Sequence, residues 1–343
     1  MSRNVAVLFL VFGTAAGCVA QTNSELTDYF QQYVGLSQDQ VAEIRGGHAV
    51  SKNLTSRIPD EIFVWGAVFV KSTPESYFKL AYDFERLRKL PDYLAIGKFG
   101  DPPQVSDLEG FSFDSDDIKA LKDCKPDDCR IQLPAGGMEG YRKVVDFSAP
   151  DALDKANEFE HKAVIERLLA YQKGGNKVLG EYNDKKNPTQ VPEQFKYMLS
   201  YAKALPKALP DYYNYLLDYP KGKPAKVENM FFWEKVKFGL KPTMRVVHVV
   251  TMQGNNLHEP AYTIAEKQLY SSHYFETALD LTYCIRSDDP NQPGFYLIMV
   301  MGSEQAGLTG FKGSILRKAA TGKTASNLQK SLETIKNALE QNE

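Results

Sequence analysis

The sequence predicts an α+β fold, in which one antiparallel sheet packs with a long C-terminal helix. Three observations support this prediction. A strand pattern at residues 60–71 runs directly into an amphipathic helix pattern, a helical and tyrosine-rich block covers residues 115–222, and strand patterns return from residue 223 before a final helix. Strands and helices that are segregated along the chain in this way are typical of α+β proteins.

The first strand and the helix after it have clear sequence signals. Residues 60–71, DEIFVWGAVFVK, are rich in β-branched and aromatic residues and predict a strand. The helix predicted over residues 73–90 begins with Thr73 as N-cap and Pro74 at the first helical position. The preceding N-terminal segment, residues 21–59, predicts two short helices.

Residues 115–222 form the helical block. Its longest helix, predicted over residues 151–175, is amphipathic and stops at two glycines. Two shorter helices follow, each begun by a proline, and both are rich in tyrosine. We expect the block to act as a cap or as a docking module for a protein partner. Its tyrosines indicate either packing against the sheet or transient contact with a membrane.

The second half of the chain predicts four strand segments and a terminal helix. Turn-rich pieces separate the segments. The strand segments are residues 227–239, 243–253, 264–285 and 294–305. The third segment is either two strands or one strand bent by a bulge. In the terminal helix, Leu328, Leu332, Ile335 and Leu339 form one apolar stripe.

Two stretches carry a resemblance to a known superfamily. The strand that leads into VKSTPESYFKLAYDFERLRKLPDY and the closing GFKGSILRKAATGKTASNLQKSLETIKNALE resemble the ends of START-like domains, the SRPBCC or helix-grip superfamily. The resemblance implies a curved antiparallel sheet around the C-terminal helix, built from residues 60–114 and 223–343, with residues 115–222 as a large helical insertion. It also implies a cavity between sheet and helix for a lipid, a sterol or another apolar ligand.

The N-terminus predicts export. Residues 1–20 contain an early arginine, a short apolar run and then small residues, which is the layout of a secretory signal peptide. The alternative is a lipoprotein signal in which Cys18 becomes the lipidated N-terminus. The chain also resembles a set of secreted bacterial proteins of unassigned function through CKPDDC, FGLKP and YSSHYF. We therefore expect a periplasmic or extracellular protein whose mature form has no transmembrane helix.

The net charge and the spacing of the cysteines further limit the classes of function that the protein can have. The formal net charge is -2 with both signs mixed along the chain, which argues against a nucleic-acid-binding protein. Cys124 and Cys129 flank a short turn, so export predicts a disulfide between them. A metal site at this pair would need more ligands. Cys284 lies within a strand pattern and is expected to be buried. No phosphate-binding loop and no dinucleotide-binding motif occurs in the sequence.

Three strand segments each place one titratable residue on an otherwise apolar face. Counting alternate positions assigns Glu234, His248 and His273 to such faces. If the strands are adjacent and the side chains level, the three converge as a polar anchor for a ligand, or as a zinc or iron site. If not, each residue is satisfied by local partners. The sequence leaves these alternatives open, and we predict no metal.

Further residues are expected to contact the ligand. Phe275 and Thr277 follow His273 at alternate positions of the same predicted face. Arg317, just before the predicted final helix, is either a surface charge or the partner of an acidic head group at the cavity mouth. Ser271 and Ser272 lie beside His273 but have no G-x-S-x-G elbow around them, so we predict no catalytic residue.

These patterns favour an exported carrier that holds an apolar ligand and needs no cofactor. One alternative is a cyclase- or hydrolase-type enzyme on the same fold, which would use Glu234, His248 and His273 for acid–base chemistry. Another is a non-catalytic interaction protein whose sheet is filled by its own side chains. Because such folds host unrelated functions, the site has to decide between them.

Overall fold

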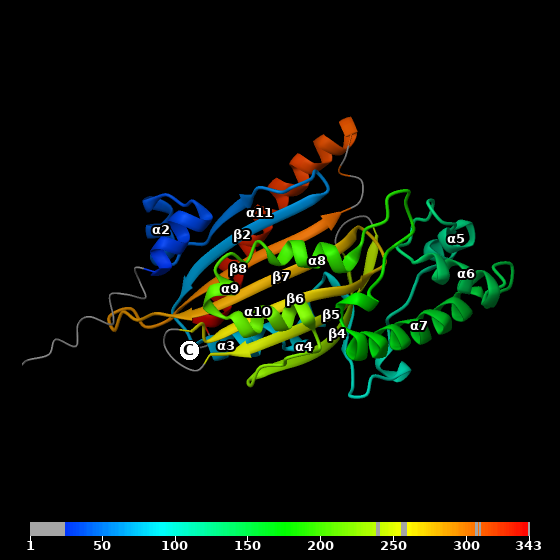
Figure 1. Ribbon diagram of the computed structural model, residues 1–343, viewed down its shortest axis with the longest axis horizontal. Coiled ribbons are helices and arrows are strands. Elements are labelled where there is room, and N and C mark those ends of the chain that lie inside the picture. Colours follow the sequence, from blue (N-terminus) through cyan, green and yellow to red (C-terminus); the bar gives the residue numbers. More distant parts are fainter. Residues whose placement is uncertain (1–24, 238–240, 255–258, 306–307, 309, 342–343) are drawn as a thin grey trace, which may run out of the picture.

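The computed structural model describes residues 25–341, except 238–240, 255–258, 306–307 and 309. The predicted signal peptide and Cys18 lie outside the described residues. The described chain forms a single antiparallel sheet with helices on both faces (Figure 1).

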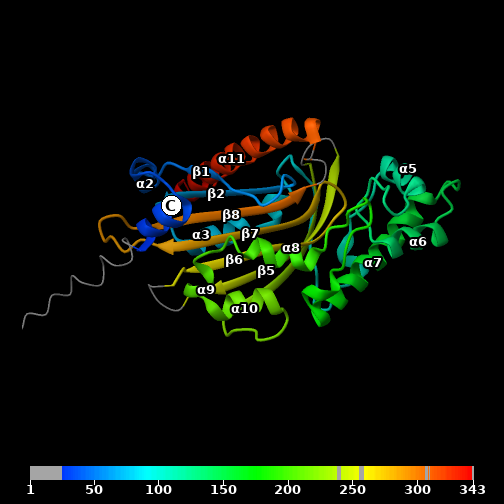
Figure 2. The ribbon, with the colours of Figure 1, turned by 45° about the horizontal axis from the view of Figure 1, so that its top comes forward.

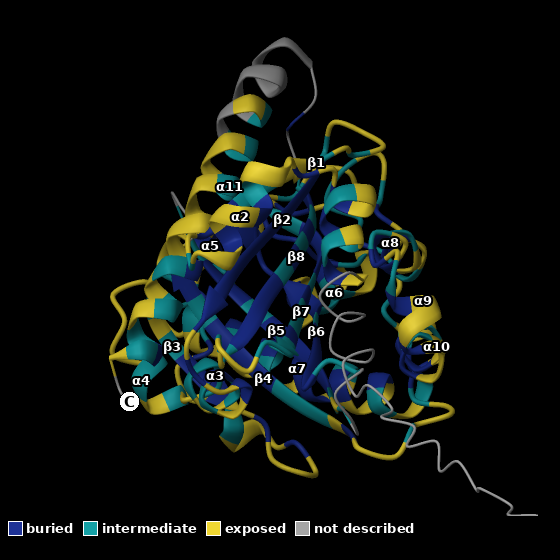
Figure 3. Ribbon diagram, turned by 90° about the vertical axis from the view of Figure 1, so that its left-hand side faces the viewer, coloured by how far each residue is buried: buried dark blue, intermediate teal, exposed yellow. Residues whose placement is uncertain are grey.

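Within the described residues the sheet has eight strands, in the order β1-β2-β8-β7-β6-β5-β4-β3. Their bounds are β1 Val50–Leu54, β2 Glu61–Val70, β3 Tyr93–Lys98, β4 Val227–Lys237, β5 Pro242–Gln253, β6 Tyr262–Ser271, β7 Phe275–Arg286 and β8 Phe295–Gln305. The sheet is curved, and the C-terminal helix α11, Gly310–Glu340, lies against its β1–β2 end (Figure 3). The predicted α+β class, with a curved antiparallel sheet and a long C-terminal helix, is therefore confirmed.

Strand β2 shows what sequence is needed when both faces of a sheet are covered by other elements. All ten of its residues are buried. Val64 and its even-numbered neighbours pack on the side of α11, whereas Trp65 and its odd-numbered neighbours pack on the opposite side. A strand that is covered on both faces needs apolar side chains at every position. This is why residues 62–70 form a continuous apolar run and do not alternate.

Helix α11 packs directly onto β2. Leu328 and Leu332, from the predicted apolar stripe, are buried against the strand. A Cβ added at Gly66 would lie 2.8 Å from Leu332 Cδ1 and 2.9 Å from Leu328 Cδ2. The glycine therefore permits a close approach of helix and strand. At this end of the sheet, the protein's own side chains fill the space between sheet and helix.

The helix predicted over residues 73–90 is two helices, α3 Pro74–Ala81 and α4 Phe84–Leu87. The first begins as expected, because the Thr73 hydroxyl accepts a hydrogen bond from the Ser76 N–H at 3.1 Å. The break comes at Asp83, whose carboxylate accepts a hydrogen bond from the Arg86 N–H at 3.0 Å. An aspartate that caps a new helix competes with continuation of the old one. Both helices lie on the same face of the sheet as α11.

The opposite face is covered by the N-terminal helices and by part of the block 115–222. The helices of the N-terminal segment are η1 Tyr29–Val34 and α2 Gln38–Arg45. Those of the block 115–222 are α5 Ser115–Asp123, α6 Ala135–Val144, α7 Ala152–Gly174, η3 Asn176–Val178, α8 Val191–Leu199, α9 Leu205–Ala208 and α10 Pro210–Asp218. A further short helix, η2 Val105–Leu108, precedes the block. Helices α8, α9 and α10 lie over the sheet, whereas α5 and α6 lie beyond its end (Figures 1 and 2). The predicted disulfide between Cys124 and Cys129 is present after α5, and Cys284 is buried without a disulfide.

The segment 264–285 is two strands joined by a turn, which was one of the two predicted alternatives. β6 ends at Ser271, β7 begins at Phe275, and Tyr274 between them has φ 66°. This left-handed conformation turns the chain and is not available within a continuous strand. The assignment of His273 to a strand face was therefore wrong, because alternation cannot be counted through a turn.

The contact between α11 and β2 generates a stability prediction. We expect Leu332→Ala to lower the free energy of unfolding by about 2–5 kcal/mol, since it leaves a cavity in a close-packed interface. Urea denaturation followed by circular dichroism measures the loss. Lys330→Ala, at an exposed position of the same helix, is the control and should change the stability by less than about 0.5 kcal/mol. Equal effects of the two substitutions would contradict this packing.

Candidate functional site

Glu234 lies on the face of the sheet that carries α3, α4 and α11. Its carboxylate forms an ion pair with Arg245 of β5, with 2.8 Å between Oε1 and Nη1. Both residues line a cavity of about 150 Å³ under α3 and α4, here called the concave pocket, whose walls include Tyr82 and Phe232. A pocket with apolar walls and few polar groups suits a small ligand, but the polar groups present are already paired with each other.

Two further carboxylates belong to the same region. Glu266 on β6 accepts a hydrogen bond from the Tyr82 hydroxyl at 2.6 Å. Asp280 on β7 is the cross-strand neighbour of Glu266. Burial, reinforced by the negative charge of Glu266, raises the pKa of Asp280 to about 7. Burial also raises the pKa of Glu234, while Arg245 opposes the rise. On this face of the sheet, the raised pKa values favour protonated carboxyl groups, and the ion pair of Glu234 with Arg245 compensates one negative charge.

His248 lies on the opposite face of the sheet from Glu234. It is buried, its Nδ1 is 2.9 Å from the Tyr171 hydroxyl, and its Nε2 is 2.8 Å from Asn229 Oδ1. The amide oxygen can only accept, so Nε2 carries the ring proton and Nδ1 accepts from Tyr171. Burial, reinforced by the positive charge of Lys267, holds the pKa of His248 well below its usual value. This neutral histidine joins the sheet to α7.

A buried lysine completes this cluster, and the sequence reasoning missed it. Lys267 on β6 is 1% exposed and donates hydrogen bonds to the Tyr171 hydroxyl, at 3.2 Å, and to Asn176 Oδ1. Burial lowers the pKa of Lys267 to about 7. The available signal was a lysine between Ala265 and Leu269 at alternate positions of an apolar strand.

His273 lies in the β6–β7 turn and binds the block 115–222. Its Nδ1 donates to the Arg130 carbonyl oxygen at 3.1 Å, and its Nε2 is 3.1 Å from Asp117 Oδ1. Burial acts to raise the pKa of Asp117, but hydrogen bonds from His273 and the α5 backbone together with Lys241 hold it below its usual value. This group ties the turn to α5 and to the disulfide loop.

The other predicted ligand contacts are also spread over the molecule. Phe275 lies near Arg245, whose guanidinium carbon is 5.8 Å from the ring centroid. Thr277 is buried on the opposite face, with its hydroxyl 3.9 Å from Met198 Sδ of α8. A bulge between these two strand positions separates their faces. Arg317 donates to the Ser56 hydroxyl at 2.6 Å and joins α11 to the β1–β2 connection.

The convergence of Glu234, His248 and His273 is therefore not found. The two faces of the sheet separate the first two, and His273 lies in a turn that contacts α5. Both faces are covered, so an apolar alternation does not say which face a residue belongs to. Among the residues that the structure describes, no group of three or more His, Cys, Asp or Glu side chains could hold a metal ion. The acid–base triad of the enzymatic alternative does not assemble.

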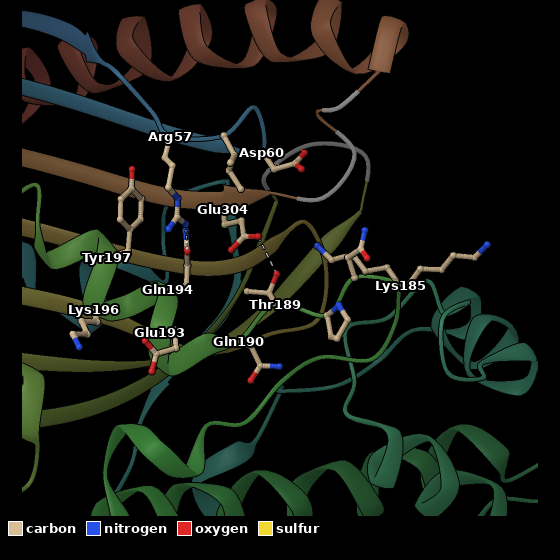
Figure 4. A pocket seen from close by; sticks show the side chains of 14 residues that line it. Arg57, Asp60, Lys185, Thr189, Gln190, Glu193, Gln194, Lys196, Tyr197 and Glu304 are labelled. Atoms are coloured by element: carbon tan, nitrogen blue, oxygen red, sulfur yellow. Dashed lines mark hydrogen bonds between the residues drawn. The ribbon is translucent and has the colours of Figure 1, made fainter.

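A large polar cleft lies where the block 115–222 meets the β1–β2 connection (Figure 4). Its volume is about 900 Å³. Two of its lining residues bind the buried Glu61: Arg57 forms an ion pair with it at 2.8 Å, and Gln194 donates a hydrogen bond to it at 2.9 Å. The Thr189 hydroxyl donates to Glu304 at 3.0 Å. These groups are used within the protein, where they fasten the block to the ends of β2 and β8.

An apolar pocket of about 190 Å³ lies on the same face of the sheet as His248. Its walls come from the N-terminal segment, from α9 and from β7 and β8. The lining residues are Glu25, Leu26, Tyr29, Ala202, Lys203, Ala204, Leu205, Ala208, Leu209, Pro260, Tyr283, Ile285 and Ile298. Sequence reasoning could not find this pocket, because its walls come from parts of the chain more than a hundred residues apart.

Comparison with known proteins adds no assignment. No family model matches the chain, and no curated protein matches it. Within residues 25–341, as far as they are described, no helix is long and apolar enough to cross a membrane.

The Lys267 cluster predicts a pH dependence of stability. The pKa of Lys267 is about 7 in the folded protein and about 10.4 in an unfolded chain. Between these values the unfolded state binds one more proton than the folded state, so stability rises with pH. The stability of the natural protein relative to Lys267→Met should therefore rise by roughly 2 kcal/mol between about pH 7.5 and 9.

Urea denaturation of both proteins at the two pH values measures this change. Lys330→Met, at an exposed position, is the control, and its difference from the natural protein should not vary with pH. A difference for Lys267→Met that is constant with pH would show that this lysine stays charged in the folded state.

Proposed function

We propose that this protein is an exported carrier that binds a small apolar ligand in the apolar pocket between α9, the N-terminal segment and strands β7 and β8. The observation that carries the proposal is the composition of this pocket. Side chains such as Leu205, Leu209, Ile285 and Ile298 supply most of its walls. Cavities lined in this way exclude water and take up apolar molecules.

The volume limits the size of the ligand. The pocket measures about 190 Å³. Pockets that enclose drug-sized molecules measure about 300–1,000 Å³. A single alkyl chain or one ring suits this space, and a sterol does not. Within the range of lipid-like ligands that the sequence suggests, the geometry favours single-chain molecules.

The proposed location differs from the cavity that the START-like resemblance implies. On the α11 side, Leu328 and Leu332 fill the space over β2, and the concave pocket contains the ion pair of Glu234 and Arg245. Burial of an apolar chain against a buried ion pair gains little, because the pair needs its polar surroundings. We therefore place the ligand on the face covered by α9.

Two features support the wider proposal of an exported START-like protein. The curved antiparallel sheet with a long C-terminal helix has the architecture expected of such domains. The disulfide between Cys124 and Cys129 fits an oxidising compartment outside the cytoplasm. The interaction-protein alternative finds its support in the filled contact of α11 with β2, but the apolar pocket on the other face favours a carrier.

Titration calorimetry with 1-octanol tests the proposal. We expect saturable binding with one site per chain. Ile285→Trp should weaken the binding about tenfold or more, since the larger side chain occupies the pocket. Organic extraction and mass spectrometry of the protein purified from its natural compartment should identify a single-chain molecule.

Leu87→Trp is the matched control, because it places the same side chain in the concave pocket on the other face. It should leave octanol binding unchanged. If Leu87→Trp abolishes binding and Ile285→Trp does not, the ligand binds in the concave pocket and the proposed location is wrong. If no saturable binding occurs, the carrier proposal fails.

A further inference from the structure

The apolar pocket adjoins a second cavity that differs in polarity. This cavity, here called the head pocket, has a volume of about 260 Å³ and shares Tyr29 and Lys203 with the apolar pocket. Its other walls come from η1, from β1 and the residues after it, from Tyr201, and from Trp65 and Val300 of the sheet. The two cavities are thus neighbours, one with mainly apolar walls and the other with more polar walls.

The charges of the head pocket have one sign. Lys52 and Lys203 line it, and none of its described lining residues is a carboxylate. Glu25 lines the apolar pocket, where it is exposed. Neither lysine forms a salt bridge with any residue that the structure describes. Two cations on one cavity without a carboxylate favour a negatively charged group.

Hydrogen-bond donors remain available in the head pocket. The Lys52 ammonium donates one bond, to the Gly35 carbonyl oxygen at 2.6 Å, and has two further protons. The Tyr29 hydroxyl accepts from Trp65 Nε1 at 3.2 Å, so its own proton is left to donate. Burial raises the pKa of Tyr29 to about 12, and the hydroxyl stays protonated at neutral pH.

From this arrangement we infer that the ligand is a single-chain carboxylate amphiphile, such as a fatty acid of medium length. Its chain lies in the apolar pocket, and its carboxylate lies in the head pocket beside Lys52, Lys203 and the Tyr29 hydroxyl. Charge-assisted hydrogen bonds from ammonium groups and a phenol match the acceptors of a carboxylate. This inference rests on the proposed function.

Calorimetric titration at neutral pH with octanoate, 1-octanol, octylamine and octyl phosphate tests the inference, because the four probes share one chain. We expect octanoate to bind about tenfold more tightly than 1-octanol, and octylamine to bind most weakly. Added salt should weaken the binding of octanoate and leave that of 1-octanol unchanged. The double variant Lys52→Gln, Lys203→Gln should lose the preference for octanoate and keep its affinity for 1-octanol.

Lys330→Gln removes an exposed lysine from α11 and should keep the preference, which controls for net charge. Equal affinity for octanoate and 1-octanol would overturn the carboxylate while leaving the carrier proposal intact. Tighter binding of octyl phosphate than of octanoate, or of octylamine than of either, would also overturn it. If none of the four probes binds, the inference and the proposed function fail together.

Discussion

The whole structure depends on the burial of one sheet from both sides. The eight strands of its described part place apolar residues on each face, and β2 is buried at every position. One face is covered by α11, α3 and α4, and the other by the N-terminal segment and by helices α8, α9 and α10. Neither cover is optional, because removing either one would expose a continuous apolar surface to water. The block 115–222 is therefore part of the core.

The same double burial decides what the titratable residues can do. A polar group under either cover must be paired or lose its charge. Glu234 is paired with Arg245, His248 is neutral between Tyr171 and Asn229, and Lys267 has a pKa of about 7. Perturbed residues of this kind often mark catalytic sites. Here their hydrogen bonds are made within the protein and join strands to the helices above them, which favours a structural role.

Much of the fold could be predicted because local signals agreed with the final packing. The long helix α7, the stripe of Leu328 and Leu332, the cap at Thr73 and the pair Cys124–Cys129 are examples. The failures came where the outcome depends on contacts between distant segments. Alternation identified the apolar sets of β4 and β5, but it could not say which face of the sheet each set occupies. For this reason the convergence hypothesis placed Glu234 and His248 on the same face. His273 lies in the turn at Tyr274 and not in a strand, which alternation cannot reveal. The break between α3 and α4 at Asp83 was not predicted, because the apolar periodicity continues through it.

The apolar pocket lies beside one of the shortest helices that cover the sheet. Helix α9 has only four residues, and together with the N-terminal segment it leaves about 190 Å³ unfilled over β7 and β8. Apolar walls that face empty space lose the contacts that a filled core supplies. A chain-like ligand restores those contacts and, by binding the folded state alone, stabilises it. In the proposed complex, the lysines of the head pocket lie at the charged end of the ligand, where the charge stays near solvent and outside the core. An apolar pocket beside a cavity that two lysines and no described carboxylate line thus has the polarity that an anionic amphiphile requires.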